Sequence, residues 1–387
     1  MFSNYAFLSF YSKNFKVGVL GGGQLGRMLL QEAINFDVKL SILDPSPSAP
    51  CADIAHEFVV GDFNDYDTVL AFGEGKDVLT IEIEHVNVEA LRVLESKGVK
   101  VYPSPAILEI VKDKGLQKQF YADHGIDTSP FFLVENADEL ASKSAEFPVM
   151  QKLRTGGYDG RGVQALIDVD DLGKAFDEPS VLEKFVDFEK EISVIIARND
   201  SGEIKSFPLV ELEFNPVANL VEFLFSPATL TQEVEVRAHE LATQVVEAFN
   251  FIGILAVEMF VCKDGRVLVN EVAPRPHNSG HHTIEASVTS QYEQHLRAIL
   301  DLPLGATNSI QAAVMVNLLG EPGHTGPVDY QGLNEVLSWP GVHPHIYGKL
   351  ETKPFRKMGH VTVCASGLAE AKALALKVKD TLKVVSC

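Results

Sequence analysis

A glycine-rich turn near the start of the chain does most to restrict the possible folds. Residues 16–20 are apolar and favour a β-strand, and the sequence Gly21-x-Gly23-x-x-Gly26 follows directly. Residues 27–36 then carry apolar side chains at helical spacing. Glycine lets backbone N–H groups approach a phosphate at the start of a helix, and Asp44 follows the next expected strand. The pattern is consistent with a dinucleotide site, with another ligand at this turn, or with close packing alone.

The alternation of strands and helices continues to about residue 105 and predicts the fold class. Strands that alternate with helices favour a doubly wound parallel sheet, so we expect an α/β domain there. Short strands joined by turns then predict an α+β region, with helices at 233–249 and 283–300. We expect four segments: an N-terminal extension (1–15), a parallel-sheet domain (16–105), a central domain (106–210) and a C-terminal part (211–387) with a small, mostly β module from about 310.

Charge and cysteine content exclude several classes of function. The chain of 387 residues has 33 Lys+Arg and 53 Asp+Glu, a formal net charge of −20. Binding to nucleic acid or to an anionic membrane requires a basic face, so we expect neither partner. The four cysteines have no metal-site spacing, which favours a reducing, cytoplasmic location. No apolar run reaches the ~18 residues of a membrane span.

A second glycine-rich segment has different chemistry. Lys152 lies on an expected strand, and the loop after it contains Gly156, Gly157, Gly160 and Gly162 among Arg, Tyr and Asp side chains. A cover for a triphosphate requires flexible backbone donors and a lysine that offsets the phosphate charge. A plain hairpin turn is the alternative, but the crowding of polar side chains favours a lid over a ligand.

Two carboxylates follow on consecutive expected strands. Glu258 and Glu271 each come after apolar residues, and a turn at 263–265 joins the two strands. With Asn270 they form a hard-oxygen set suited to Mg²⁺ between phosphates. Salt-bridged glutamates are the alternative, but a strand glutamate among apolar neighbours is costly without a partner, which favours the metal.

Two further segments are rich in polar donors. The first, at 273–282, contains Arg275, His277, Asn278 and Ser279. Such a density of donors suits an anionic substrate. The segment also has adjacent histidines, but no third ligand at the usual spacing supports a transition-metal site. The second, at 347–360, is a basic cluster in an acidic chain, and its lysines and arginines suit a phosphate. A polar surface loop is the alternative for each.

Taken in this order, the motifs resemble those of the ATP-grasp superfamily. The sequences GGGQLGRM, QKLRTGGYDGRG, NEVAPRPHNSGHHTIEAS and FRKMGH are similar to the 5-(carboxyamino)imidazole ribonucleotide synthetase family over about residues 16–387. The resemblance implies an ATP-grasp fold and a ligase of the type that forms the ATPase subunit of phosphoribosylaminoimidazole carboxylase. Such an enzyme uses ATP, bicarbonate and Mg²⁺, with Mn²⁺ able to substitute, to carboxylate the amino group of 5-aminoimidazole ribonucleotide in purine synthesis. It also implies a cytoplasmic homodimer that passes its product to a separate mutase.

The resemblance assigns roles to matching residues. ATP would contact Lys114, Lys152, Gly157, Tyr158, Gly160, Gly162, Glu183, Lys184, Phe185, Val186, Glu191 and Asn270, with Glu183 and Val186 at the adenine and Glu191 at the ribose. The ribonucleotide and bicarbonate would contact Gln24, Leu25, Glu82, Tyr158, Arg161, Arg275, His277, Asn278, Ser279, Lys349 and Arg356, the last two at the 5′-phosphate. Glu258 and Glu271 would hold Mg²⁺. The expected catalytic residues are Asp159, Arg161, Glu82 and Arg275, with Asp159 or Glu82 as the base.

Two departures and three alternatives accompany this interpretation. Lys114 stands where arginine is frequent, and residues 211–216 lack an expected histidine. A formate-dependent glycinamide ribonucleotide formyltransferase has the same fold, but the donor-rich segment and the glycine turn favour the carboxylating family. A nicotinamide dehydrogenase would leave the lid and the paired glutamates unexplained. A non-catalytic nucleotide-binding protein would not need Lys152 and both glutamates.

Overall fold

The N-terminal region is a doubly wound parallel sheet. The computed structural model describes residues 15–157, 162–215 and 220–387. The elements of this region are β1 (Val17–Leu20), α1 (Gln24–Asn35), β2 (Leu40–Asp44), β3 (Glu57–Val60), α2 (Tyr66–Gly73), β4 (Val78–Ile81), α3 (Val88–Ser96) and β5 (Lys100–Tyr102). All pairs are parallel in the order β3-β2-β1-β4-β5, which confirms the predicted α/β domain. The chain reverses its direction of winding between β1 and β4, where ligands bind in sheets of this kind.

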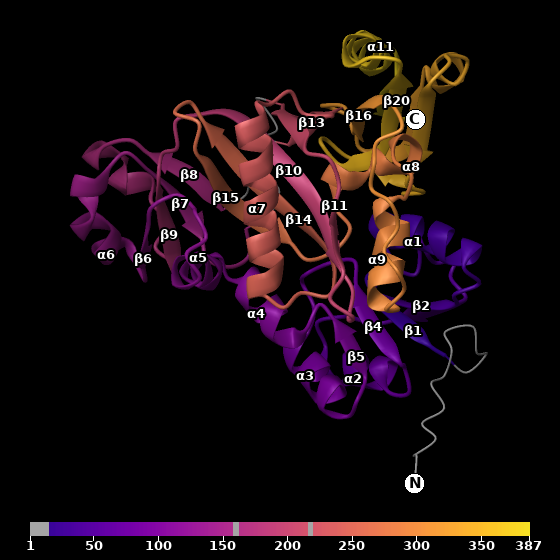
Figure 1. The fold of residues 1–387 in the computed structure, drawn as a ribbon, viewed down its shortest axis with the longest axis horizontal. Helices are drawn as coiled ribbons and strands as arrows, with labels where there is room; N and C mark the ends of the chain where they lie inside the picture. Colours follow the sequence, from indigo (N-terminus) through magenta and orange to yellow (C-terminus); the bar gives the residue numbers. More distant parts are fainter. Residues whose placement is uncertain (1–14, 158–161, 216–219) are drawn as a thin grey trace.

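Three α-helices and a four-stranded antiparallel sheet come next (Figure 1). They are α4 (Pro105–Lys112), α5 (Lys114–Asp123), β6 (Phe131–Val134), α6 (Ala137–Ser142), β7 (Val149–Leu153), β8 (Val163–Leu166) and β9 (Ser180–Lys184), with 3-10 turns at Ser144–Glu146 and Val169–Lys174. The sheet has the order β6-β9-β7-β8. Asp113 separates α4 from α5, because its carboxylate accepts hydrogen bonds from the N–H groups of Gly115 and Leu116 and so caps α5.

A large antiparallel sheet joins the centre of the chain to its C-terminal part. Its strands are β10 (Phe188–Arg198), β11 (Ile204–Ser206), β12 (Val210–Phe214), β13 (Val221–Ser226), β14 (Gly253–Cys262), β15 (Val267–Ala273), β16 (Ala312–Leu319), β18 (Val342–Ile346) and β20 (Lys357–Ala365). The order is β15-β14-β10-β12-β13-β16-β20-β18, with β11 beside β10. Because β12 pairs with β10, and β13 with β16, hydrogen bonding continues across the boundaries we expected near 210 and 310.

Helices on both faces connect this sheet to its neighbours. The remaining elements are α7 (Gln232–Ala248), a 3-10 turn at Asn278–Gly280, α8 (Thr283–Ala286), α9 (Gln291–Ile299), β17 (Gly326–Gln331), α10 (Leu333–Val336), β19 (Glu351–Thr352), α11 (Leu368–Thr381) and β21 (Lys383–Ser386). Leu241 and Val245 of α7 pack on β10, β14 and β15. Tyr292 and Leu296 of α9 share a core with α1 and with Tyr347, so α9 holds the parallel sheet against the rest of the molecule (Figure 1). In the parts of the chain that the structure describes, no helix has the length and hydropathy needed to cross a bilayer.

Two predicted elements end earlier than their periodicity indicated. The helix expected at 283–300 is two helices, because the hydroxyl of Ser290 accepts the N–H of Glu293 and starts α9 anew. The strand expected at 181–186 ends at Lys184. Phe185 and Val186 therefore lie in a short connection between β9 and β10, which is where a hinge would be.

Candidate active site

Backbone N–H groups of the glycine turn after β1 donate to protein carboxylates and are not free to bind a phosphate. The N–H of Gly22 donates to Asp44 Oδ2 at 2.7 Å, and the N–H of Gly23 donates to Glu82 Oε1 at 2.9 Å. A Cβ on Gly23 would lie 2.6 Å from that Glu82 oxygen, so the close approach requires glycine. Because protein carboxylates take these donors, the structure does not support the dinucleotide interpretation of the turn.

Glu82 lies at the point where the parallel sheet reverses its winding. Burial raises the pKa of its carboxyl to about 7, although the N–H of Gly23 and the charge of Arg275 act in the opposite direction. Gln24 is the first residue of α1 beside this carboxyl. Leu25 directs its side chain into the core shared with α9, which leaves its backbone for a ligand.

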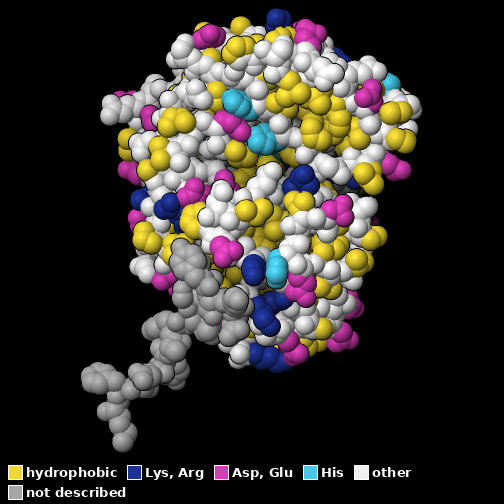
Figure 2. Space-filling model, turned by 90° about the vertical axis from the view of Figure 1, so that its right-hand side faces the viewer, with side chains coloured by type: hydrophobic (Ala, Val, Ile, Leu, Met, Phe, Trp, Pro, Cys, Tyr) yellow, Lys and Arg dark blue, Asp and Glu magenta, His cyan; other side chains and the backbone are white. Residues whose placement is uncertain are grey.

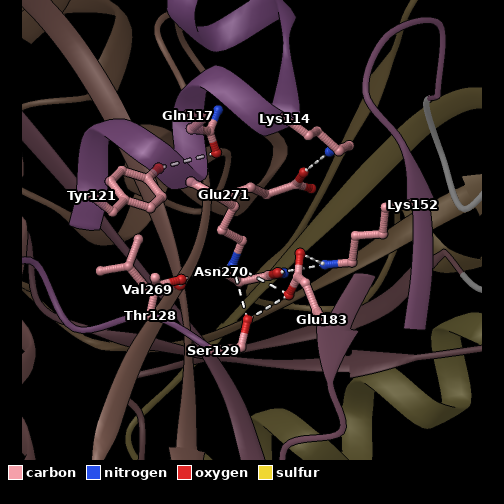
Figure 3. A network of polar contacts seen from close by, with 11 residues as sticks. Lys114, Gln117, Tyr121, Thr128, Ser129, Lys152, Glu183, Val269, Asn270 and Glu271 are labelled. Carbon is pink, nitrogen blue, oxygen red and sulfur yellow. Dashed lines mark hydrogen bonds and ion pairs between the residues drawn. The ribbon is translucent and has the colours of Figure 1, made fainter. Parts of the chain in front are cut away.

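Lysines on one face of α5 meet acidic side chains of two other elements (Figure 3). Lys114 forms an ion pair with Glu271 of β15. Lys118, one helical turn later, has its Nζ 3.2 Å from Glu183 Oε2 of β9. We did not predict Lys118 as a site residue; its i,i+4 spacing from Lys114 is the signal that places both on one helix face.

The carboxylate of Glu183 is enclosed by donors and is only 3% exposed. The hydroxyl of Ser129 donates to Oε2 at 2.6 Å, and Lys152 Nζ lies 3.0 Å from Oε1. Burial by itself would raise its pKa, but Lys152 and Lys118 lower it to about 2. The side chain of Glu183 thus faces the lysines. The predicted contact with adenine would therefore have to come from the backbone of residues 183–186.

Three further carboxylates share one face of the large sheet. Glu258 of β14 is the cross-strand partner of both Ser193 of β10 and Glu271 of β15, and Glu191 lies two residues before Ser193. Burial raises the pKa of Glu191 to about 7. Burial and the charges of Glu271 and Glu191 raise the pKa of Glu258, whereas the ammonium of Lys114 lowers that of Glu271.

A β-bulge turns Asn270 toward Lys152. The pairing passes from Glu258 opposite Glu271 to Met259 opposite Val269, so Asn270 is the extra residue. Its Oδ1 accepts a hydrogen bond from Lys152 Nζ at 3.1 Å. The bulge thus places Asn270 directly before Glu271 with its amide oxygen at Lys152, and its place in a hard-oxygen set stays a prediction.

The two glutamates and Asn270 fit a divalent cation held together with a ligand. Within residues 15–157, 162–215 and 220–387, the structure contains no group of three or more His, Cys, Asp or Glu side chains that could hold a metal ion by themselves. Glu258 and Glu271 face each other across the strands, and the raised pKa of Glu258 reflects negative charge that a cation would offset. Mg²⁺ commonly takes one or two carboxylates and completes its shell with phosphate oxygens and water.

The donor-rich segment after β15 spans the junction with the parallel sheet. Arg275 Nη2 lies 2.8 Å from Glu84 Oε1, just beyond β4. His277 Nε2 lies 3.7 Å from Glu258, and burial lowers the pKa of this imidazole to about 3. Ser279 is buried, and its hydroxyl contacts the hydroxyl of Ser193 and the ring of His277, so its contact with a substrate stays a prediction. Asn278 lies between them in the 3-10 turn.

The predicted phosphate-binding residues lie on the C-terminal segment that passes the start of α1. A Cβ on Gly348 would lie 3.6 Å from Arg27 Nη1, which places Lys349 close to the glycine turn. Lys349 donates to the carbonyl of Lys357 and Arg356 to that of Glu351. On the face drawn in Figure 2, Lys and Arg side chains occur in small groups among acidic ones.

Comparison with known proteins matches three consecutive parts of the chain to known domains. Residues 15–112 match the ribonucleotide synthetase preATP-grasp domain, 119–292 the ATP-grasp domain and 313–374 the phosphoribosylaminoimidazole carboxylase C-terminal domain. The crystal structure of N5-carboxyaminoimidazole ribonucleotide synthetase from Thermotoga maritima is 44% identical, with a TM-score of 0.89 over 96% of this chain and 100% of that one. The chain belongs to the N5-carboxyaminoimidazole ribonucleotide synthase family.

Two other relatives extend this result. An Aspergillus clavatus N5-carboxyaminoimidazole synthase, solved in complex with ADP and 5-aminoimidazole ribonucleotide, is 34% identical, with a TM-score of 0.86 over 95% of this chain and 99% of that one. Phosphoribosylaminoimidazole carboxylase of Candida glabrata is 40% identical over 372 residues, which are 92% of this chain. The chain spans 64% of the length of that relative. The resemblance to the ATP-grasp family and the predicted fold are therefore confirmed.

Four predicted lid residues of this family member lie outside the described residues: Tyr158, Asp159, Gly160 and Arg161. The base of the lid is described. Gly162 accepts the N–H of Leu153 through its carbonyl, and Gly157 lies beside it. Arg154 contacts both carboxylate oxygens of Asp113, so the base of the lid is tied to the start of α5. We did not predict this contact, because the two residues are far apart in the sequence.

Proposed function

We propose that the chain carboxylates the exocyclic amine of 5-aminoimidazole ribonucleotide, using ATP and bicarbonate, to give 5-(carboxyamino)imidazole ribonucleotide, ADP and phosphate. The observation that carries the proposal is the position of Arg275. This residue comes two positions after the end of β15, the strand that carries Glu271, and it contacts Glu84 just beyond β4 at the winding reversal of the parallel sheet. An ATP site and a second substrate site thus meet at one cationic side chain. The ligands of the Aspergillus clavatus relative belong to these two classes of substrate.

ATP would bind between the α5 lysines, the lid and the carboxylate face of the large sheet. Lys114 and Lys152 are the cations next to the glutamates and would contact the phosphates. The backbone of 183–186 would take the adenine, and Glu191 the ribose. Glu258, Glu271 and Asn270 would hold Mg²⁺, which when bound offsets the charge that develops on the phosphates.

The reaction requires ATP, bicarbonate and the amine of the ribonucleotide to meet in a site from which water is excluded. A bicarbonate oxygen attacks the terminal phosphorus of ATP, and ADP leaves with the electrons of the broken P–O bond. The carboxyphosphate then separates into CO₂ and phosphate, and the ribonucleotide amine forms a C–N bond to CO₂ as it loses a proton. Arg275 would hold the anion, and closure of the lid would exclude the water that hydrolyses carboxyphosphate.

Two carboxyl groups are candidates for the base that accepts the amine proton. Glu82 has a pKa raised to about 7, which suits proton transfer near neutral pH. Asp159 belongs to the lid and lies outside the described residues. If Asp159 is the base, Asp159→Asn loses carboxylation and keeps ATP binding; unchanged turnover of that variant refutes the role of Asp159.

The test is ADP release from Mg-ATP with 5-aminoimidazole ribonucleotide, with and without added bicarbonate. Release that requires the imidazole nucleotide, with a bicarbonate-dependent carbamate product, is the expected result. Formate with glycinamide ribonucleotide is the control, because a formyltransferase has the same fold. Release with that pair alone would overturn the substrate and keep the ATP site.

Assembly, location and pathway remain part of the proposal. We infer a cytoplasmic homodimer, with no nucleic acid or membrane partner. The product is a carbamate, and we propose that a mutase activity then moves its carboxyl group to carbon. Equilibrium sedimentation of the chain tests the dimer, and a purine-requiring host that lacks its own synthase tests the pathway.

A further inference from the structure

Lys118 is a buried cation that none of the proposed steps uses. It is 2% exposed, and its Nζ donates to the hydroxyls of Thr128 at 2.7 Å and Ser129 at 3.0 Å. Its Nζ also lies 3.2 Å from Glu183. Burial lowers the pKa of Lys118 to about 8, although the charge of Glu183 acts in the opposite direction. A charged side chain that is this deeply buried is retained only with a partner, and here the partner is Glu183.

Glu183 has two cationic partners of different accessibility. Lys152 meets Oε1 from the side of the lid, whereas Lys118 meets Oε2 from beneath. The side chain of Lys152 is 15% exposed and that of Lys118 is 3% exposed. Lys152 can therefore turn toward a ligand, but Lys118 is held by the two hydroxyls.

We propose that Lys118 is a positioning residue that holds the charge of Glu183 when Lys152 turns from Glu183 to the phosphates of ATP. The inference rests on the proposed ATP site. If Lys118 carried no charge, Lys152 would be the partner that neutralises a buried carboxylate. Moving Lys152 to a phosphate would then leave the Glu183 carboxylate unpaired in a site of low polarity. The unfavourable free energy of that unpaired charge would weaken the binding of ATP.

The contacts of Thr128 extend this arrangement to the metal-binding strand. Its hydroxyl donates to the carbonyl of Val269 at 2.6 Å, directly before Asn270 and Glu271. Figure 3 shows Glu183 between Lys152 and Ser129, and Thr128 beside Val269. Lys118 thus fixes the position of Glu183 relative to the strand that would hold Mg²⁺.

The test measures binding of Mg-ATP to the full chain by titration calorimetry. Lys118→Gln can still donate to both hydroxyls but brings no charge, and we expect its Kd for ATP to rise at least tenfold. If Lys118→Gln does not fold, Lys118→Met is used in its place. It also removes the charge, through an apolar side chain, and its Kd for ATP should likewise rise at least tenfold. Lys76→Met is the control, because the Lys76 side chain is 9% exposed and bonded to a serine hydroxyl and a glutamate, but lies in the parallel-sheet domain.

A second variant separates charge balance from a merely structural role. Glu183→Gln removes the carboxylate that Lys118 balances, so Lys118→Gln should no longer weaken binding when combined with it. We expect the Kd of the double variant to lie within threefold of that of Glu183→Gln. A tenfold loss that persists in the double variant, or a Kd of Lys118→Gln equal to that of the unaltered chain, would overturn the inference. Failure of the unaltered chain to bind ATP would instead overturn the proposed function.

Discussion

The ion pair between Arg275 and Glu84 gives the sharpest test of how the two substrate sites are joined. Arg275 lies after β15, and Glu84 lies after β4 of the parallel sheet. Their closest atoms are 2.8 Å apart, and Arg275 also donates to the carbonyl of Pro276. The Nε of Arg275 has no partner among the described residues. Glu84 is therefore the side chain that determines where the guanidinium points.

The structure sets the size of the effect of Glu84→Gln. The two side chains are 18% and 26% exposed, so the pair is only partly screened by water. A hydrogen bond between two charged groups contributes about 1.5–3 kcal/mol, and we take the bond that glutamine keeps to the guanidinium as roughly half as strong. The expected loss is about 0.8–1.5 kcal/mol. If that energy aims Arg275 at the reacting anion, kcat/KM falls about 4- to 13-fold.

The assay is bicarbonate-dependent ADP release at varied 5-aminoimidazole ribonucleotide, together with urea unfolding of the same variant. Glu293→Gln is the matched control, because Glu293 forms an ion pair of similar exposure with Arg297 on α9, away from the glutamates. We expect the control to keep its kcat/KM. A Glu84→Gln variant that is less stable but retains kcat/KM within twofold would refute the reasoning, since the pair would then support only the fold.

Three further predictions concern the metal site, pH and the core. Glu271→Gln removes one carboxylate of the cation set and the partner of Lys114, so the magnesium concentration at half-maximal ADP release should rise at least tenfold; an unchanged value contradicts the assignment. Because the pKa of Glu82 is raised from 4.5 to about 7, the folded chain holds this proton more tightly, and its stability should fall relative to Glu82→Gln as pH rises from 4.5 to 7, then stay level. Urea unfolding at pH 5, 6, 7 and 8 measures this difference, and a constant difference refutes the shift. Leu241→Ala in the core under α7 should lower the free energy of unfolding by about 2–5 kcal/mol, whereas the half-exposed Leu376→Ala should change it by less than about 0.5 kcal/mol; equal losses would contradict the packing.

Local patterns predicted the kinds of element and the ligand-binding motifs. The parallel sheet, the glutamate hairpin and the long helix α7 are where periodicity and spacing placed them. The break at Ser290 was missed, because a capping hydroxyl has the same effect on hydropathy as any polar residue of a helix. The glycine turn left several interpretations open for a related reason: glycine spacing indicates that a group approaches the backbone closely, but only the fold shows that this group is Glu82.

The sequence by itself determined the family and predicted its chemistry, since the lysine strand, the glycine-rich loop after it and the two strand glutamates are each recognised from neighbours along the chain. Only the tertiary structure decided how these groups are connected. Lys118 beneath Glu183, Glu84 beside Arg275 and the bulge at Asn270 join residues from different elements. Such contacts depend on strand register and on the packing of elements that are far apart in sequence, and hydrophobic periodicity constrains which face of an element is buried but not which residue of another element it meets.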